Sequence, residues 1–132
     1  MTPAPYPARI AIVDDEDAVR KSLRRLLRVA GFEGMDYASG TEFLQACSNN
    51  WPHCALIDLQ MPGLTGIETQ ERLTRAGIHL PVIIITAHAD AVVRERCTAL
   101  GIRALLLKPF DGEQLLSLIA SIVGNARTDS QC

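Results

Sequence analysis

One segment restricts the fold more than any other. The run Leu80-Pro-Val-Ile-Ile-Ile-Thr86 is apolar and rich in β-branched residues, and its polar and apolar positions do not alternate. A strand of this composition is buried on both faces, which is typical of a parallel sheet covered by helices. Any fold for this chain must therefore supply helices to both faces of a sheet.

Strands and helices alternate along the rest of the chain. The strands are predicted at 9–13, 32–37, 53–58, 80–86 and 103–107, and the helices at 17–30, 40–48, 65–76, 89–100 and from 111 or 112 to Gly124. Such alternation with short loops predicts a doubly wound α/β domain with right-handed crossovers. We expect a flavodoxin-like fold, with five parallel strands in the order 2-1-3-4-5 and five helices.

Length, hydrophobicity and charge limit the functions that the chain can have. The 132 residues fit one domain, and a hydrophobic fraction of 48% excludes a disordered chain. A net charge of −2 gives no reason to expect direct nucleic-acid binding, and no run of 18 apolar residues is present to span a membrane. The cysteines form no C-x-x-C pair, which favours reduced thiols in a cytosolic protein; they are Cys47, Cys54, Cys97 and Cys132.

Domain boundaries follow from the polar and proline-rich ends of the chain. Residues 1–7 carry proline at alternate positions and are predicted to form a flexible N-terminal arm. Residues 8–124 form the domain, and residues 125–132 are predicted to be a polar tail or the start of a linker.

Polar side chains close four of the five strands. The first strand ends at Asp14 and Asp15, the third at Asp58, the fourth at Thr86 and the fifth at Lys108. In an open α/β sheet, ligands bind outside the carboxyl ends of the strands, near the point where the strand order reverses. For the order 2-1-3-4-5 this point lies between strands one and three. We therefore expect the three aspartates to share one shallow pocket.

Three carboxylates in one pocket repel one another. Two unit charges about 5 Å apart cost about 3 kcal/mol at an effective dielectric near 20, so a cation must compensate. Hard oxygen ligands on a short loop suit Mg²⁺. Each residue alone has a structural explanation, since acids cap helices, a strand-end lysine is usually solvated and a strand threonine usually packs. Together, however, Asp58, Thr86, Lys108 and a metal are the groups needed for phosphoryl transfer to a carboxylate.

These motifs together resemble the receiver domain of two-component response regulators, and the FixJ-type branch in particular. The resemblance covers about residues 8–124 and rests on Val13-Asp14-Asp15-Glu16, Asp58 with Met61-Pro62-Gly63 and Gly66, Thr86-Ala87, and Lys108-Pro109-Phe110. It implies that Asp58 is the phosphoacceptor and that a sensor histidine kinase is the phosphodonor. It also implies that Asp15, Asp58 and the backbone carbonyl of Gln60 ligate Mg²⁺ directly, while Asp14 acts through water. Thr86 and Lys108 would bind the phosphoryl oxygens.

The resemblance also implies a cytoplasmic signalling domain, not an enzyme beyond its own phosphotransfer and dephosphorylation. Phosphorylation would switch the surface of the last two helices and the fifth strand, and so control homodimerisation or an output such as transcription. These elements carry more apolar residues than one buried stripe requires. The extra residues are expected on the switching surface, and they are Val92, Leu106, Leu116 and Ile119. FixJ-type proteins usually carry a DNA-binding domain after a linker, so two alternatives stay open: a receiver domain with a DNA-binding output domain beyond Cys132, or a stand-alone regulator.

Several positions are expected to modulate this chemistry. Leu105 stands three residues before Lys108, where the family usually carries an aromatic residue whose rotation accompanies a shift of the threonine. Gln60 and His88 occupy variable positions that in similar proteins tune hydrolysis of the aspartyl phosphate, although a solvated loop histidine explains His88 equally well. Ala87 follows the threonine in the motif, and the family pattern implies a cis bond before Pro109.

The first helix carries a basic face from Arg20 to Arg28. The simpler interpretation is a solvated charged stripe. The alternative is a docking surface for the kinase, because kinases in this family contact that helix.

Three other functions fit the sequence less well. The first is a phosphatase, because the D-x-D-x-[TV] motif of haloacid-dehalogenase-type phosphatases matches Asp15-Glu16-Asp17-Ala18-Val19. However, Asp17 begins a predicted helix, and Asp58 would have no role in such an enzyme. A flavin or nucleotide binder would need Gly, Ser or Thr amides in the first loop, which instead is acidic. A constitutive interaction module would not need the intact acid, threonine and lysine set.

Overall fold

Five parallel strands form one sheet in the order β2-β1-β3-β4-β5, as predicted. They are β1 (Arg9–Val13), β2 (Glu33–Tyr37), β3 (Cys54–Asp58), β4 (Val82–Thr86) and β5 (Ala104–Leu107). The structure is a computed structural model that describes residues 7–131, with side chains described as far as residue 124. All five residues of β4 are buried. The strand begins two residues later than predicted, since Pro81 has no N–H for the ladder.

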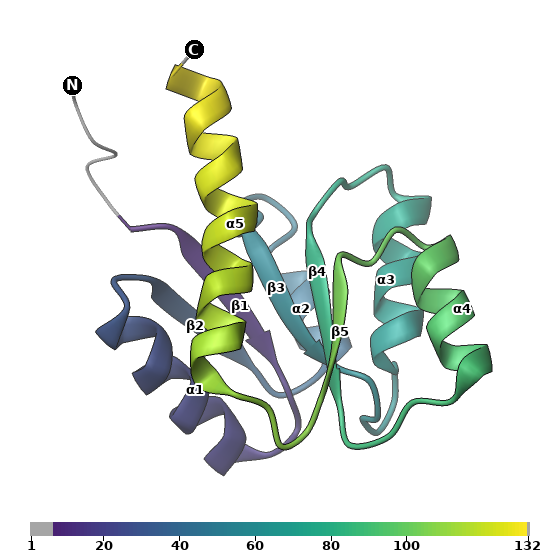
Figure 1. The fold of residues 1–132 in the computed structure, drawn as a ribbon. Helices are drawn as coiled ribbons and strands as arrows, with labels where there is room; N and C mark the ends of the chain where they lie inside the picture. Colours follow the sequence, from purple (N-terminus) through teal and green to yellow (C-terminus); the bar gives the residue numbers. More distant parts are fainter. Residues whose placement is uncertain (1–6, 132) are drawn as a thin grey trace.

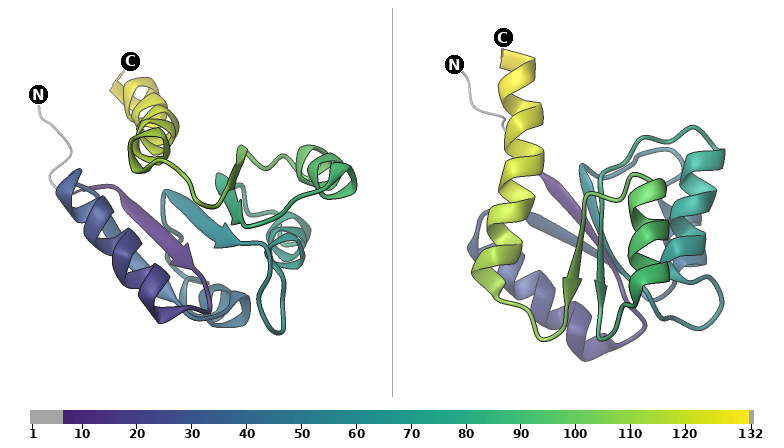
Figure 2. Two further views of the ribbon diagram at one scale, coloured as in Figure 1. Left: turned by 60° about the horizontal axis from the view of Figure 1, so that its bottom comes forward. Right: turned by 45° about the vertical axis from the view of Figure 1, so that its right-hand side comes forward.

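Helices cover both faces of this sheet. They are α1 (Asp17–Val29), α2 (Gly40–Ala46), α3 (Gly66–Arg75), α4 (Ala91–Ala99) and α5 (Gly112–Gln131). Figures 1 and 2 show α1 and α5 on one face and α2, α3 and α4 on the other. This is the doubly wound architecture that the buried segment at β4 requires.

Alternate residues of the strands build two separate hydrophobic cores. One core joins the sheet to α1 and α5 and includes Ile10, Ile12, Leu27, Leu56, Ile83, Ile85, Leu115 and Ile119. The other joins it to α2, α3 and α4 and includes Ala11, Val13, Phe43, Ile57, Leu73, Ile84 and Cys97. The central strands lack a polar and apolar alternation because each of their faces contributes to one of these cores.

Glycines end three of the helices but not the last one. Gly31, Gly77 and Gly101 follow α1, α3 and α4 with positive φ angles, the left-handed conformation that ends a helix. Gly124 does not adopt that conformation and lies inside α5, which continues to Gln131. The predicted helix end at Gly124 was therefore wrong, since residues 125–131 continue α5. Figure 1 shows α5 extending beyond the edge of the sheet.

Two residues that were expected on the switching surface are core residues instead. Leu106 and Ile119 are buried between the sheet and α5, and Leu116 packs against the same core. Val92 remains on the surface of α4 with 69% of its area exposed, and Leu107 on β5 is also exposed. The expectation that Leu106 and Ile119 were surplus to the core was wrong, because α5 packs over the β1, β3 and β4 side chains.

Some expectations fall outside the described residues, namely the arm at residues 1–6 and the state of Cys132. Within the described part of the chain, no helix combines the length and apolar character needed to cross a membrane.

Candidate functional site

Two neighbouring strands bring the three aspartates together. Val13 of β1 pairs with Ile57 of β3, so the residues that follow, Asp14 and Asp58, reach the same level at the carboxyl edge of the sheet. Carboxylate oxygens of Asp14, Asp15 and Asp58 all lie within 4.8 Å of one another. The predicted clustering of these acids is confirmed, and the cluster has the composition and spacing to hold a metal ion.

The three acids differ in their access to solvent. Asp14 is 3% exposed and Asp58 is 7% exposed, whereas Asp15 is exposed. The Oδ1 atom of Asp14 accepts a hydrogen bond of 2.9 Å from the backbone N–H of Glu16, which fixes the direction of that carboxylate. The site is thus a shallow pocket with two buried acids and one acid at its rim.

Lys108 brings a positive charge to the two buried acids. Its Nζ lies 3.5 Å from Oδ2 of Asp14 and 3.9 Å from Oδ2 of Asp58. Its backbone N–H donates to the carbonyl of Thr86 at 2.8 Å, which anchors the residue after β5 to the end of β4. The bond between Lys108 and Pro109 is cis, as the resemblance implies. The hydrogen bond to Thr86 and the two short distances to the carboxylates together place this lysine beside the acids.

The pKa of Asp58 is raised from its ordinary value of 3.8 to about 6. Burial is the largest cause, and the neighbouring charge of Asp14 is the second. Lys108 and the backbone N–H of Gln60 lower the pKa, and Asp15 raises it slightly. The Asp58 carboxyl group is therefore mostly ionised at neutral pH, but its charged form is destabilised by its surroundings.

Thr86 is fully buried at the end of β4. Its hydroxyl donates to the carbonyl of His88 at 3.1 Å and accepts from the N–H of His88 at 3.3 Å. Both described hydrogen bonds of this hydroxyl thus go to the β4–α4 loop, and Thr86 connects the edge of the site to that loop.

The positions predicted to modulate the site lie around it. Four of them are exposed on the loops at the carboxyl edge of the sheet, namely Gln60, Ala87, His88 and Pro109. Leu105 is half-buried, pairs with Ile84 in the sheet and packs into the core beneath α2, α3 and α4.

Arg20 contacts the site, although the sequence predicts it only as part of the basic face of the first helix. Its guanidinium donates to the backbone carbonyl of Asp14 at 2.7 Å, to Asp36 at 3.3 Å and to Asp17 at 3.2 Å. It therefore holds the acidic loop against α1 and β2. The available signal was its position in the first turn of the helix that follows the acidic run.

Gly66 is required by the geometry around Asp58. A Cβ atom at this position would lie 2.6 Å from the backbone carbonyl oxygen of Asp58, too close for any other residue without a backbone shift. Next to it, the side chain of Thr65 accepts from the N–H of Glu68 and the Glu68 side chain accepts from the N–H of Thr65, a capping box. The motif glycine thus allows α3 to begin directly beside the acceptor strand.

Comparison with known proteins places this geometry in a family. Residues 10–120 match the response regulator receiver domain. Nodulation protein W of Bradyrhizobium diazoefficiens is 34% identical over 120 residues, covering 91% of this chain and 53% of that protein. The transcriptional regulatory protein FixJ of Azorhizobium caulinodans is 32% identical over 122 residues, covering 92% and 58% respectively.

A solved structure of a response regulator receiver protein is also similar to this chain. The response regulator receiver protein from Burkholderia phymatum has a TM-score of 0.77 and 44% identity, covering 89% of this chain and 95% of that one. The chain spans little more than half the length of the two curated relatives above. The chain therefore belongs to the receiver domain family of two-component response regulators, and its similarity to FixJ and nodulation protein W is consistent with the FixJ-type branch.

Proposed function

We propose that Asp58 accepts a phosphoryl group from the phosphohistidine of a sensor histidine kinase, with Mg²⁺ bound at the acidic cluster. The observation that carries this proposal is the position of Asp58 between two other acids and the ammonium group of Lys108. A buried carboxylate with a cation on one side and metal-ligating oxygens on the other suits an in-line attack on phosphorus. The P–N bond of the donor breaks as the P–O bond to Asp58 forms.

The donor set fits Mg²⁺. Three carboxylates within 4.8 Å of one another offer hard oxygen ligands, and Asp15 at the rim leaves space for water on the metal. Asp15, Asp58 and the backbone carbonyl of Gln60 would ligate the ion directly, and Asp14 through water. When bound, the ion neutralises the acids and stabilises negative charge on the phosphoryl oxygens.

The residues of the chain then have separate roles. The Asp58 carboxylate is available as nucleophile at neutral pH, since its pKa is about 6. Lys108 would pair with a phosphoryl oxygen, in place of part of its present contact with Asp14 and Asp58. Arg20 would hold the backbone of the acidic loop in place. Gln60 and His88, exposed beside the site, would tune hydrolysis of the aspartyl phosphate.

Thr86 would couple the phosphoryl group to the rest of the domain. Its hydroxyl would exchange its hydrogen bonds with His88 for one to a phosphoryl oxygen, and the β4–α4 loop would then rearrange. Because Leu105 replaces the usual aromatic residue, the shift would reach β5 and α4 through aliphatic packing. The surface formed by α4, β5 and α5, where Val92 and Leu107 are exposed, would respond by homodimerisation or by control of an output.

The partners follow from the family and from the charge of α1. This helix exposes four basic residues, namely Lys21, Arg24, Arg25 and Arg28. Their positive charges would contact an acidic surface of the kinase. FixJ is named as a transcriptional regulatory protein, so we propose transcription as the output, through a DNA-binding domain beyond Cys132. The domain would act in the cytoplasm as a signalling module that catalyses only its own phosphotransfer and dephosphorylation.

The test is the phosphorylation of purified protein by phosphoramidate in the presence of Mg²⁺, followed by intact-mass spectrometry. The wild type should gain one phosphoryl group, and EDTA should prevent it. Asp58→Asn should gain none, whereas Glu95→Gln, an exposed acid on α4, should behave as the wild type. A phosphoryl group on Asp15 in the Asp58→Asn variant would refute the proposal and favour a phosphatase-type mechanism.

Dimerisation is tested separately with beryllofluoride and Mg²⁺, which imitate the phosphorylated state. Sedimentation should show a monomer that becomes a dimer on their addition. An unchanged monomer would refute the dimerisation step alone and leave phosphorylation of Asp58 in place.

A further inference from the structure

Asp36 lies on β2, the strand at the edge of the sheet beside β1, and it pairs with two arginines of α1. Its Oδ2 atom lies 3.3 Å from Nε of Arg20, and its Oδ1 atom lies 3.4 Å from Nη1 of Arg24. Each oxygen of the carboxylate therefore has a cation of its own. The two arginines are four residues apart on α1, so they lie on the same side of the helix and reach one carboxylate.

Gly34 allows α1 to lie this close to β2. A Cβ atom at this position would lie 3.2 Å from Cγ of Arg24 and 3.2 Å from Cδ1 of Ile12, so a larger residue would push against the helix. Gly34 and Asp36 are two residues apart on the strand and therefore face the same side of the sheet. The glycine thus leaves room for the stem of Arg24, and the aspartate receives its charge.

Both backbone polar groups of Asp14 are held by contacts that lead to β2. The N–H of Asp14 donates to the carbonyl of Tyr37 at 3.1 Å, and the Asp14 carbonyl accepts from Nη1 of Arg20 at 2.7 Å. That carbonyl belongs to the peptide that joins Asp14 to Asp15, two of the three clustered acids. The orientation of this peptide therefore depends on where Arg20 is held.

Asp36 is the partner best placed to hold Arg20. The Arg20 side chain is 14% exposed and that of Asp36 is 27% exposed, so water screens this pair only in part. Asp17 also accepts from Arg20 at 3.2 Å, but it is 61% exposed and pairs with Lys21 as well, and such surface pairs contribute little. Separate nitrogens of the planar guanidinium serve the Asp14 carbonyl and Asp36, so fixing one contact directs the other.

We propose that Asp36 is a positioning residue for the Mg²⁺ site, and that it acts on the peptide between Asp14 and Asp15 through Arg20. This role rests on the proposed binding of Mg²⁺ at the acidic cluster. Residues that hold metal ligands in place without touching the ion commonly change metal affinity by about tenfold or more when they are replaced. Arg24 uses the other oxygen of Asp36, so a partner that draws Arg24 away from the basic face leaves the hold on the metal site intact.

The experiment is a titration of the ¹⁵N-labelled chain with MgCl₂ at constant ionic strength, followed by the amide NMR shifts of Asp15 and Gln60. Asp36→Asn keeps the shape of the side chain, removes its charge, and should weaken Mg²⁺ binding by about threefold to tenfold. With phosphoramidate at saturating Mg²⁺, the variant should still reach the wild-type extent of phosphorylation, because Asp58 and Lys108 are unchanged. A general loss of structure would lower that extent as well.

A double-substitution cycle with Arg20→Met separates positioning from the loss of a negative charge. If Asp36 acts through Arg20, Asp36→Asn should weaken Mg²⁺ binding by less than about twofold in the Arg20→Met background. A long-range effect of the lost charge would persist in that background. Arg20→Lys keeps the positive charge but replaces the fork by a single ammonium group, so it should weaken Mg²⁺ binding about as much as Asp36→Asn. This variant keeps the test decisive if Asp36→Asn fails to fold.

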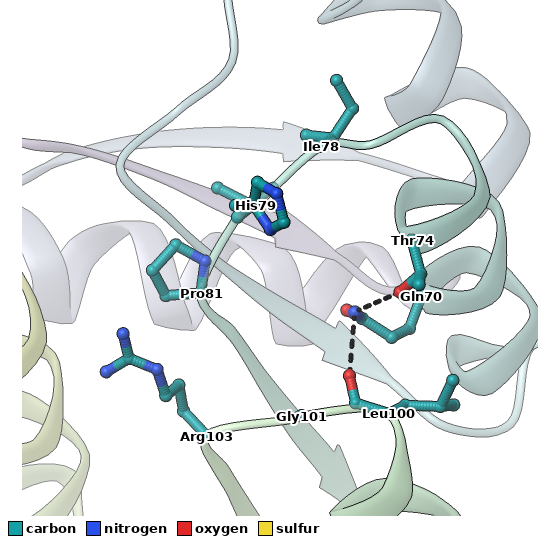
Figure 3. Close-up of a pocket in the computed structure, with 9 residues that line it drawn as sticks. Gln70, Thr74, Ile78, His79, Pro81, Leu100, Gly101 and Arg103 are labelled. Carbon is teal, nitrogen blue, oxygen red and sulfur yellow. Dashed lines mark hydrogen bonds between the residues drawn. The ribbon is translucent and has the colours of Figure 1, made fainter.

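Two control variants should bind Mg²⁺ at least as tightly as the wild type. Arg24→Gln removes the other ion pair of Asp36 and leaves the contact with Arg20 in place. Thr74→Val removes a polar contact with the Gln70 amide, drawn as a dashed line in Figure 3, beside the residues that lead into the amino ends of β4 and β5. The second control shows whether the loss of a side-chain contact at the other end of the sheet is enough to change Mg²⁺ affinity.

The outcomes separate this role from the proposed function itself. Unchanged Mg²⁺ affinity in Asp36→Asn or Arg20→Lys, an undiminished effect of Asp36→Asn in the Arg20→Met background, or an equal loss in either control would overturn the role of Asp36. In each of these cases, Mg²⁺ binding and phosphorylation of the wild type would leave the proposed function in place. A wild-type chain that does not bind Mg²⁺ would refute the proposed function and the role of Asp36 together.

Discussion

Asp58→Asn should stabilise the metal-free fold at neutral pH, although it removes the central residue of the site. The Asp58 carboxylate is almost fully buried and lies beside the charge of Asp14. Asparagine keeps the shape of the side chain and removes its charge. The substitution therefore removes the burial cost and the repulsion, and it also removes the attraction to Lys108.

The pKa of Asp58 sets the size of the effect. A rise from 3.8 to about 6 corresponds to at most about 3 kcal/mol of free energy of unfolding. Because Asp15 at the rim keeps the pocket in contact with water, we expect about 1–2 kcal/mol. The folded state binds this proton more tightly than the unfolded state. The stability that the neutral group contributes is therefore fully present below pH 3.8 and is lost as the pH rises to about 6.

Urea denaturation in EDTA between pH 4 and pH 8 measures this effect. The free energy of unfolding of Asp58→Asn minus that of the wild type should be small at the acidic end, should grow as the pH rises to about 6, and should then level off. Glu95→Gln, which removes an exposed charge on α4, should show no comparable rise. Addition of Mg²⁺ at pH 8 should stabilise the wild type more than the variant, because the metal compensates the same repulsion.

An Asp58→Asn variant that is as stable as the wild type, or less stable, at pH 8 in EDTA would mean that Lys108 already compensates the buried charge. A difference in stability that does not change between pH 4 and pH 8 would mean that the charge of Asp58 is not its origin.

Three further substitutions test other contacts of the site, and a fourth, Gly124→Ala, serves as a control. Arg20→Met removes the hydrogen bond to the Asp14 carbonyl and two ion pairs, so the free energy of unfolding in urea should fall by about 1–3 kcal/mol. The variant should also bind Mg²⁺ more weakly, and an unchanged Mg²⁺ affinity would contradict the positioning role of Arg20. Gly66→Ala should lower the free energy of unfolding by about 1–3 kcal/mol, because the added Cβ would meet the Asp58 carbonyl. Gly124→Ala, where open space surrounds the position in α5, should leave the free energy of unfolding unchanged or raise it by up to about 1 kcal/mol. Lys108→Met should raise the pKa of Asp58 further in a carboxyl NMR titration, and a lower pKa would refute the assigned contact.

Local patterns were sufficient for much of the fold. The element types and the two helical layers follow from hydrophobic periodicity and the rules for parallel sheets. With the strand order of a flavodoxin-like fold, the strand ends then predict the meeting of Asp14, Asp15 and Asp58, and the structure agrees. The end of α5 was missed because a glycine between an apolar and a polar segment does not reveal its own backbone conformation. Leu106 and Ile119 were misplaced because a count of apolar residues does not say how closely α5 lies over the sheet.

The sequence by itself determined the element types, their order and the set of groups at the carboxyl edge, because all of these depend on residue period and on neighbours along the chain. Only the tertiary structure decided the raised pKa of Asp58 and the role of Arg20 on the acidic loop. Each of these depends on groups from separate elements that packing brings within a few ångströms. Desolvation and hydrogen bonding act at that distance, and a linear pattern carries no measure of it.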